Sequence, residues 1–137
     1  MADGKVQLEL VTPEKRVLTQ AVDEVRAPGA DGSFGVRPGH VPFLARMRPG
    51  ELVAGTGGST IRFAVGEGFV QVADDRVLVL AETAERAEEI DLTAARGDVE
   101  AETRKLKAMK EADGDYELQR AKVERAAARV LVASRKG

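Results

Sequence analysis

The residues that could support catalysis in this chain of 137 residues are few and poorly placed for it. A single histidine, His40, excludes most hydrolytic sites, because neither a triad motif nor a metal site with several imidazoles can be assembled around one ring. The absence of cysteine excludes a thiol nucleophile, a zinc–thiolate site and a disulfide framework. We therefore expect His40 to have a structural or interface role, and we expect no metal site.

Three further segments resemble catalytic or phosphate-binding motifs but have simpler interpretations. Asp74 and Asp75 are adjacent carboxylates, yet neighbouring residues of a strand or turn point in different directions, so acid/base catalysis is disfavoured. Residues 55–58 and 66–68 are rich in glycine, but neither segment is followed by the Lys-Ser/Thr and helix of a phosphate-binding loop. These patterns favour hairpin turns at 55–58 and 74–75 and a β-bulge at 66–68, and we expect a protein that is not an enzyme.

Positive charge is concentrated in the last part of the chain. Residues 116–137 contain six cations and two carboxylates, a net charge of +4, whereas residues 1–115 carry −6. One interpretation is a solvated helix whose cations lie favourably near its C-terminus, and the other is docking against an acidic protein surface. The segment lacks the large apolar side chains with which a helix enters a lipid surface. The cations along its middle are Arg120, Lys122, Arg125 and Arg129.

The elements that carry these residues fall into two regimes. All five prolines lie at or before residue 49, and turn-forming residues punctuate the first part at short intervals. Between the turns, apolar residues alternate with period two, as in residues 6–11 and 61–65, which indicates half-buried strands. Residues 77–81 form a continuous apolar run, typical of a strand covered on both faces. Residues 1–85 are therefore predicted to form a β-sandwich or barrel.

From about residue 86 the apolar period changes to three and four, which predicts helices. The first helix carries its stripe at Leu92, Ala95, Val99, Leu106 and Met109, with Asp91 as its N-cap. A break at residues 112–115 precedes a second helix, with Asp115 as N-cap and its stripe at Tyr116, Val123, Ala127 and Val130. The short Gly-bearing loop predicts that residues 86–137 form an antiparallel two-helix hairpin, and the alanine-rich stripe predicts a close but weak interface.

Overall charge and hydropathy exclude other classes of protein. A formal net charge of −2 and a pI near 5.6 disfavour nucleic-acid binding. No apolar stretch approaches the roughly 20 residues that cross a bilayer, and the polar start of the chain does not resemble a signal peptide. We expect a soluble protein of a reducing cytoplasm.

A family resemblance emerges from motifs spread along the chain. The most specific is Gly35-Val36-Arg37-Pro38-Gly39-His40-Val41-Pro42-Phe43-Leu44. Further blocks are Leu10-Val11-Thr12-Pro13, Arg48-Pro49-Gly50, Gly66-Glu67-Gly68-Phe69-Val70 and Val79-Leu80-Ala81-Glu82-Thr83. In this order, and essentially from end to end, the chain resembles the epsilon subunit of bacterial and plastid F-type ATP synthases.

The resemblance implies a fold and a function. The fold is a β-sandwich of about ten strands followed by a C-terminal two-helix hairpin, in agreement with the two regimes. The function is non-catalytic: the sandwich joins the gamma subunit of the central stalk to the c-ring, as part of the rotor that couples proton transport to ATP synthesis. The hairpin is mobile and inhibits ATP hydrolysis by the alpha and beta subunits. The expected location is the cytoplasmic face of the bacterial plasma membrane, with membrane association only through the complex.

The resemblance also implies two sets of contact residues. The ring-facing set is Asp31, Gly32, Ser33, Pro38, Gly39 and His40. Family members often have two carboxylates in the first of these loops, and here Ser33 stands at the second position. The inhibitory set, directed at an acidic segment of beta, is Arg120, Lys122, Arg125 and Arg129.

A nucleotide motif of some family members is incomplete here. The motif Ile/Leu-Asp-x-x-Arg-Ala matches at Ile90 and Asp91, but Ala94 stands where the arginine belongs. Arg96 lies two residues further on, about 200° around the helix, and cannot simply substitute. We expect no cofactor and no tight binding of ATP as a regulatory ligand.

Two alternatives from other classes remain open. One is a free-standing β-sandwich module that binds a ligand and dimerises through its helices. The other is an enzyme that uses carboxylate pairs, which the absence of paired acids in any recognisable pocket motif disfavours.

Overall fold

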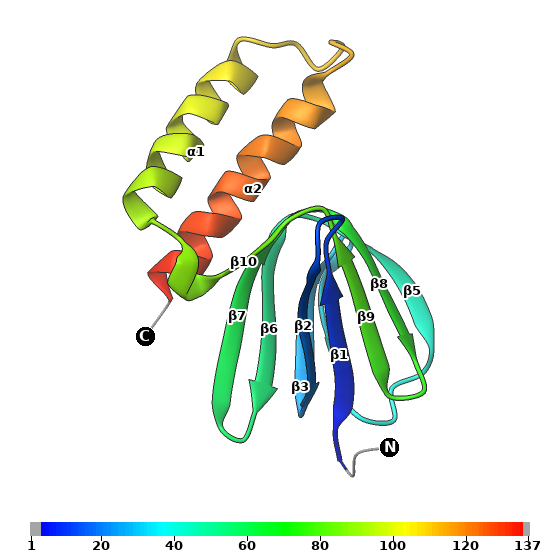
Figure 1. Ribbon diagram of the computed structural model, residues 1–137. Coiled ribbons are helices and arrows are strands. Elements are labelled where there is room, and N and C mark those ends of the chain that lie inside the picture. Colours follow the sequence, from blue (N-terminus) through cyan, green and yellow to red (C-terminus); the bar gives the residue numbers. More distant parts are fainter. Residues whose placement is uncertain (1–3, 136–137) are drawn as a thin grey trace.

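The computed structural model describes residues 4–135, which form ten strands and then two α-helices (Figure 1). The strands are β1 (Val6–Val11), β2 (Arg16–Val22), β3 (Glu24–Gly29), β4 (Gly32–Val36), β5 (Phe43–Met47), β6 (Gly50–Thr56), β7 (Ser59–Val65), β8 (Gly68–Ala73), β9 (Arg76–Ala81) and β10 (Ala84–Arg86). A short 3-10 helix, Ala87–Glu89, leads to α1 (Leu92–Lys107) and α2 (Tyr116–Ser134).

The strands form one sheet that curls over its own core as a sandwich. Its order is β10-β7-β6-β3-β5-β8-β9-β1-β2, and β4 pairs with β3 beside this path. The pairing of β1 with β9 is parallel, whereas the other described pairs are antiparallel. The predicted fold class, a sandwich of about ten strands with a C-terminal helical hairpin, is confirmed.

The sandwich core is mainly aliphatic. Strand alternation sends every second side chain inward, so that Val6, Leu8 and Leu10 of β1 are at most 1% exposed. Phe63 is the largest fully buried side chain of the described residues. No residue of α1 or α2 belongs to this core cluster, so the strands supply it by themselves.

Both predicted hairpin turns are present. Gly57 and Gly58 connect β6 to β7 with φ of +57° and +83°, and Asp74 and Asp75 connect β8 to β9 with φ of +52° and +58°. Two residues at positive φ match the right-handed twist of the flanking strands. The Asp74-Asp75 pair is therefore a turn, as predicted.

The prediction that β9 is covered on both faces is wrong. Val77, Val79 and Ala81 are buried, but Leu80 is 46% exposed. β9 does lie inside the sheet, between β8 and β1. Its apolar outer side chains lack a covering layer because the helices lie elsewhere, over β6 and β7.

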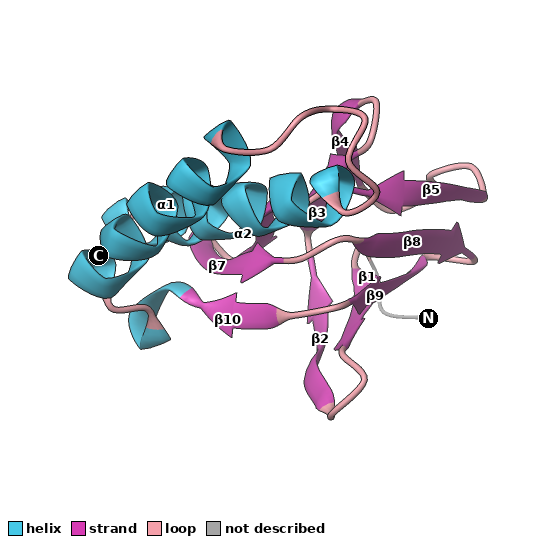
Figure 2. Cartoon of the chain, turned by 90° about the horizontal axis from the view of Figure 1, so that it is seen from above, coloured by secondary structure: helices cyan, strands magenta, loops and turns pink. Residues whose placement is uncertain are grey.

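The helices form the predicted antiparallel hairpin, and the cap of α1 is confirmed: the Asp91 carboxylate accepts a hydrogen bond of 3.0 Å from the Ala94 N–H. Asp115 occupies the N-cap position of α2, but its side chain makes no capping hydrogen bond. Figure 2 shows the hairpin displaced toward β7 and β10, away from β5 and β8. Of the two helices, α2 makes the contacts with β6 and β7, and α1 packs on α2.

The apolar stripe predicted for α2 is partly wrong. Ala127 is exposed, whereas its neighbours Ala126 and Ala128 are buried together with Val132. The reason is that α2 is covered on two sides, by α1 and by the strands, so its buried arc is wider than one stripe. Sequence periodicity assumed a single covered face.

Candidate interaction surfaces

The hairpin rests on the sandwich through a small apolar cluster at its base. The cluster joins Ala64 of β7 to residues of the linker and both helices, namely Ala87, Ile90, Ala95, Ala128, Val132 and Ala133. Alanine dominates this set, so little apolar area is removed from water. Apolar contacts alone therefore hold the hairpin weakly.

Charged side chains make further contacts between α2 and the sandwich. Arg125 forms a bidentate pair with Glu67, with Nε to Oε1 and Nη2 to Oε2 both at 2.8 Å. Two parallel N–H···O bonds give this pair a defined geometry. The hydrogen bonds from Arg125 hold the pKa of Glu67 below its ordinary value, although partial burial opposes them. The carboxylate is thus charged in the docked position.

Arg129 connects three elements. Its Nε donates to Glu85 Oε1 of β10 at 2.8 Å, and its Nη1 donates to Asp98 Oδ2 of α1 at 3.0 Å. Hydrogen bonding to Glu85 is the main cause that raises the pKa of Arg129. This one guanidinium links α2 to both the sandwich and the first helix.

Two further ion pairs flank these. Arg48 Nη2 donates to the Glu124 carboxylate at 2.6 and 2.5 Å, and Arg135 Nη1 donates to Glu51 Oε1 at 2.9 Å. In the four interface pairs the side chains are 12–52% exposed, and exposed pairs contribute only about 0.2–1 kcal/mol each. The hairpin is therefore held on the sandwich largely by ion pairs, each of which contributes little free energy.

The four cations expected to contact an acidic partner are in different situations. Arg125 and Arg129 face the sandwich, as described above. Arg120 pairs with Glu117 and Glu124 of its own helix, at 3.5 and 3.4 Å. Lys122 is exposed. Lys136, which contributed to the +4 charge, lies outside the described residues.

A polar contact joins the two helices in the middle of the hairpin. Gln119, 8% exposed, donates from Nε2 to the backbone oxygen of Glu102 at 3.0 Å and to Oε1 of the same residue at 3.1 Å. This hydrogen bond is the main reason that the pKa of Glu102 lies below its usual value, and Lys105 and Lys122 add to the effect. The helices are thus tied to each other independently of the sandwich.

The two loops expected to face a c-ring lie at opposite ends of β4. Asp31 precedes Gly32 and Ser33 at the start of the strand, where the Ala30 N–H donates to Arg46 O at 2.9 Å. Pro38, Gly39 and His40 follow its other end, where the Gly39 N–H donates to Asp75 Oδ1 at 2.7 Å. A five-residue strand separates the loops by roughly 17 Å. The structure does not bring them together at one end of the sandwich.

What the two loops share is the edge of β4. This strand pairs with β3 alone among the described strands, so its other edge is unpaired. The His40 ring contacts the Phe43 ring, with centroids 5.0 Å apart, and the Phe43 ring contacts that of Phe34 in β4, with centroids 5.1 Å apart. An open strand edge flanked by two polar loops is a surface on which a partner can lie side-on.

The outer face of β5, β8 and β9 is a second candidate surface, which we call the outer face and define by Leu44, Phe69 and Leu80. Their exposed fractions are 68%, 48% and 46%. Phe69 lies opposite Leu80, and Leu44 lies opposite Gln71 in the adjacent strand pair. Clustered exposed apolar side chains on a sheet are typical of a protein interface.

Residues of the incomplete nucleotide motif have structural roles. Ile90 is 2% exposed and belongs to the apolar cluster at the base of the hairpin. Asp91 uses its carboxylate to cap α1. Both side chains therefore support the hairpin.

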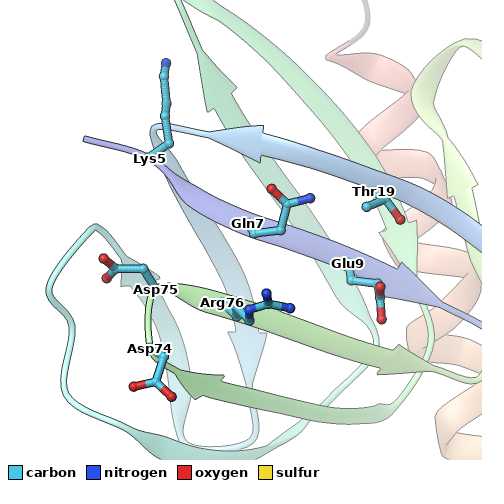
Figure 3. A pocket seen from close by; sticks show the side chains of 7 residues that line it. All are labelled: Lys5, Gln7, Glu9, Thr19, Asp74, Asp75 and Arg76. Carbon is cyan, nitrogen blue, oxygen red and sulfur yellow. The ribbon is translucent and has the colours of Figure 1, made fainter. Parts of the chain in front are cut away.

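A cavity of about 420 Å³ lies on the side of β1 and β9 and is lined by Lys5, Gln7, Glu9, Thr19, Asp74, Asp75 and Arg76 (Figure 3). Asp74 and Asp75 sit at the strand ends, whereas Glu9 lies further along β1, so these carboxylates do not converge as an acid/base pair. Among residues 4–135, no group of three His, Cys, Asp or Glu side chains could hold a metal ion. None of the helices in this range is long and apolar enough to span a membrane.

Sequence reasoning missed the sandwich side of the docking contacts. Arg48, Glu51, Glu67 and Glu85 are separated from their partners on α2 and at its C-cap by 44 to 84 residues. Only the charge imbalance between the two parts of the chain hinted that such partners exist.

Comparison with known proteins assigns the chain to a family. Residues 5–87 match the family model described as ATP synthase, Delta/Epsilon chain, beta-sandwich domain. An ATP synthase epsilon chain of Anaeromyxobacter sp. (strain K) is 52% identical over 93% of this chain and 97% of its own length. An ATP synthase epsilon chain of Geobacter metallireducens is 45% identical over 96% of this chain and 95% of its own length. A chain in the structure of the Euglena gracilis mitochondrial ATP synthase shares the fold, with a TM-score of 0.79, 22% identity, and coverage of 96% of this chain and 81% of its own. This chain therefore belongs to the ATP synthase delta/epsilon family, as an epsilon chain.

Proposed function

We propose that this chain is the central-stalk epsilon subunit of an F-type ATP synthase, without an active site of its own, and that its hairpin inhibits ATP hydrolysis. The observation that carries the proposal is that the similarity to curated epsilon chains extends over 97% of their length, through the hairpin as well as the sandwich. The alternative of a free-standing ligand-binding module has no comparable similarity in its support.

In this role the outer face binds the gamma subunit. It offers Leu44, Phe69 and Leu80 on a stable sheet, and removing such side chains from water contributes about 25 cal/mol per Å². A sheet face is also pre-organised, because its backbone is held by the ladder on both sides of β8 and β9.

The edge of β4 faces the c-ring. Its two flanking loops, Asp31–Ser33 and Pro38–His40, lie at opposite ends of the strand, so a ring can contact both only if the sandwich lies on its side. Asp31 then supplies a single carboxylate to the polar loops of the ring, since Ser33 is uncharged. The chain reaches the cytoplasmic face of the membrane only through these contacts.

The hairpin inhibits hydrolysis when it leaves the sandwich and presents Arg120, Lys122, Arg125 and Arg129 to an acidic surface of the beta subunit. The shallow, alanine-rich docking cluster supports this proposal, because a small free-energy difference between two positions lets a partner shift the population. ATP is not required as a ligand, since Ala94 removes the arginine of the nucleotide motif.

Co-purification tests the proposal. A tagged full-length chain, expressed in its own cells, should recover gamma, the c subunit and the catalytic subunits in fixed stoichiometry. Recovery of a lone homodimer carrying a small ligand would instead establish the alternative of a free-standing binding module. A truncated chain of residues 1–91 should retain gamma and the c subunit, because the proposed contact surfaces for both lie on the sandwich.

A further inference from the structure

Two arginines of α2 already hold carboxylates in the docked conformation. Arg125 binds Glu67 through two bonds of 2.8 Å, and Arg129 binds Glu85 through Nε at 2.8 Å. We call these two pairs the ionic latch. The guanidinium side chains are 33% and 28% exposed, so part of each remains accessible to solvent. Their hydrogen-bonding directions toward the sandwich are nevertheless occupied.

The latch carboxylates bind the same guanidinium N–H groups that an acidic partner would bind. A guanidinium presents its N–H groups in a fixed fork, and a bidentate carboxylate uses one side of that fork completely. While Glu67 fills the fork of Arg125, a carboxylate from another protein cannot form the same pair. Arg120 and Lys122 differ, since neither has a partner on the sandwich among the described contacts.

We propose that Glu67 and Glu85 are internal competitors that mask Arg125 and Arg129 from acidic protein surfaces, so that hairpin release and partner binding are one exchange of carboxylates. The inference deepens the proposed inhibitory role and rests on it for the identity of the partner. Within the latch, the exchange replaces two ion pairs by two others, whereas the pairs Arg48–Glu124 and Arg135–Glu51 are broken on release. The equilibrium is therefore set by the difference between the contacts of the two states.

The helices leave the sandwich together in this scheme. Gln119 ties α2 to Glu102 of α1, and Arg129 also contacts Asp98 of α1. Neither contact involves the sandwich. Loss of the latch therefore weakens the docking of the hairpin while its two helices stay joined to each other.

The first experiment measures docking in the full-length chain. Because the protein lacks cysteine, spin labels can be attached uniquely at Thr60→Cys on β7 and Leu118→Cys on α2, both exposed positions, and their separation measured by pulsed dipolar spectroscopy. We compare Glu67→Gln/Glu85→Gln with the control Asp74→Asn/Glu111→Gln, which changes net charge equally at exposed carboxylates of two turns. Each sample is measured at about 0.01 M and 1 M salt, where the Debye length falls from about 30 to 3 Å.

The latch variant should raise the ratio of released to docked chains by about 2- to 30-fold at low salt, the range expected for two partly exposed pairs. High salt should release the parent chain and the control, and should have less effect on the latch variant. An unchanged separation in the latch variant and at high salt would overturn the proposal.

The second experiment separates the masking idea from the inhibitory role. An acidic peptide of ten alternating Asp and Glu residues, labelled with a fluorophore, is titrated with each variant at low salt. Binding should tighten by the same factor as docking weakens in the latch variant and should stay unchanged in the control. Equal binding by the latch variant and the parent would reject masking. Failure of every variant to inhibit hydrolysis by the assembled complex, with the docking response present, would instead reject the inhibitory role alone.

Discussion

Leu44 provides a direct test of the outer face, because it is 68% exposed and its removal should affect binding more than folding. Fully burying a leucine side chain contributes about 1.5–3 kcal/mol, so the exposed two thirds correspond to about 1–2 kcal/mol. The substitution Leu44→Ala should therefore weaken binding of the purified chain to gamma by about 5- to 30-fold. The midpoint of thermal unfolding should fall by a few degrees at most, since about a third of the side chain is covered.

Leu118→Ala is the matched control. Leu118 is 69% exposed, almost the same fraction as Leu44, but it lies on α2 at the far end of the hairpin from the apolar base cluster. Isothermal titration of gamma with each variant gives the two dissociation constants. An unchanged affinity for Leu44→Ala, or an equal loss for Leu118→Ala, would refute the assignment of gamma to the outer face.

Three further predictions follow from the hairpin and its linker. Lowering the pH should release the hairpin, because Arg125 lowers the pKa of Glu67 in the docked state. The stabilisation by this pair is present above the ordinary glutamate pKa of about 4.5 and is lost as the pH falls through the lowered value. The spin-label separation should report this release, and Glu67→Gln should reduce its dependence on pH. A chain of residues 1–91 should unfold cooperatively in urea, because the sandwich core contains no helix residue; a gradual, non-cooperative transition would show that the helices are required. Calorimetry should detect no ATP binding at micromolar concentrations, since no arginine follows Asp91 at the motif position, and saturable binding with a dissociation constant in the low micromolar range would contradict this.

Much of the fold could be predicted because local patterns determine it. Alternation gave the strands around Leu8 and Phe63, and the capping side chain of Asp91 marked the start of α1. Two predictions failed for one physical reason. Periodicity shows that Leu80 or Ala127 is apolar, but whether a second layer covers the residue depends on where distant elements pack.

The interaction surfaces were less predictable. The cations of α2 stood out as a group, but nothing local connects Arg125 to Glu67, which lies 58 residues earlier. Long-range ion pairs carry no spacing rule, unlike i,i+4 pairs within a helix. In the same way, the placement of Asp31 and His40 at opposite ends of β4 follows from strand direction, which motif matching ignores.

The most direct test of the central claim is ATP hydrolysis by the assembled soluble sector with and without the hairpin. The comparison uses the full-length chain and two variants. One is a chain of residues 1–91, which keeps β10 and lacks both α-helices. The other is a full-length chain in which four cations are replaced by Ala, namely Arg120, Lys122, Arg125 and Arg129. With stoichiometric incorporation confirmed for each, we predict that both variants raise the rate of hydrolysis while leaving assembly with gamma intact. Equal rates in all three complexes would contradict an inhibitory hairpin.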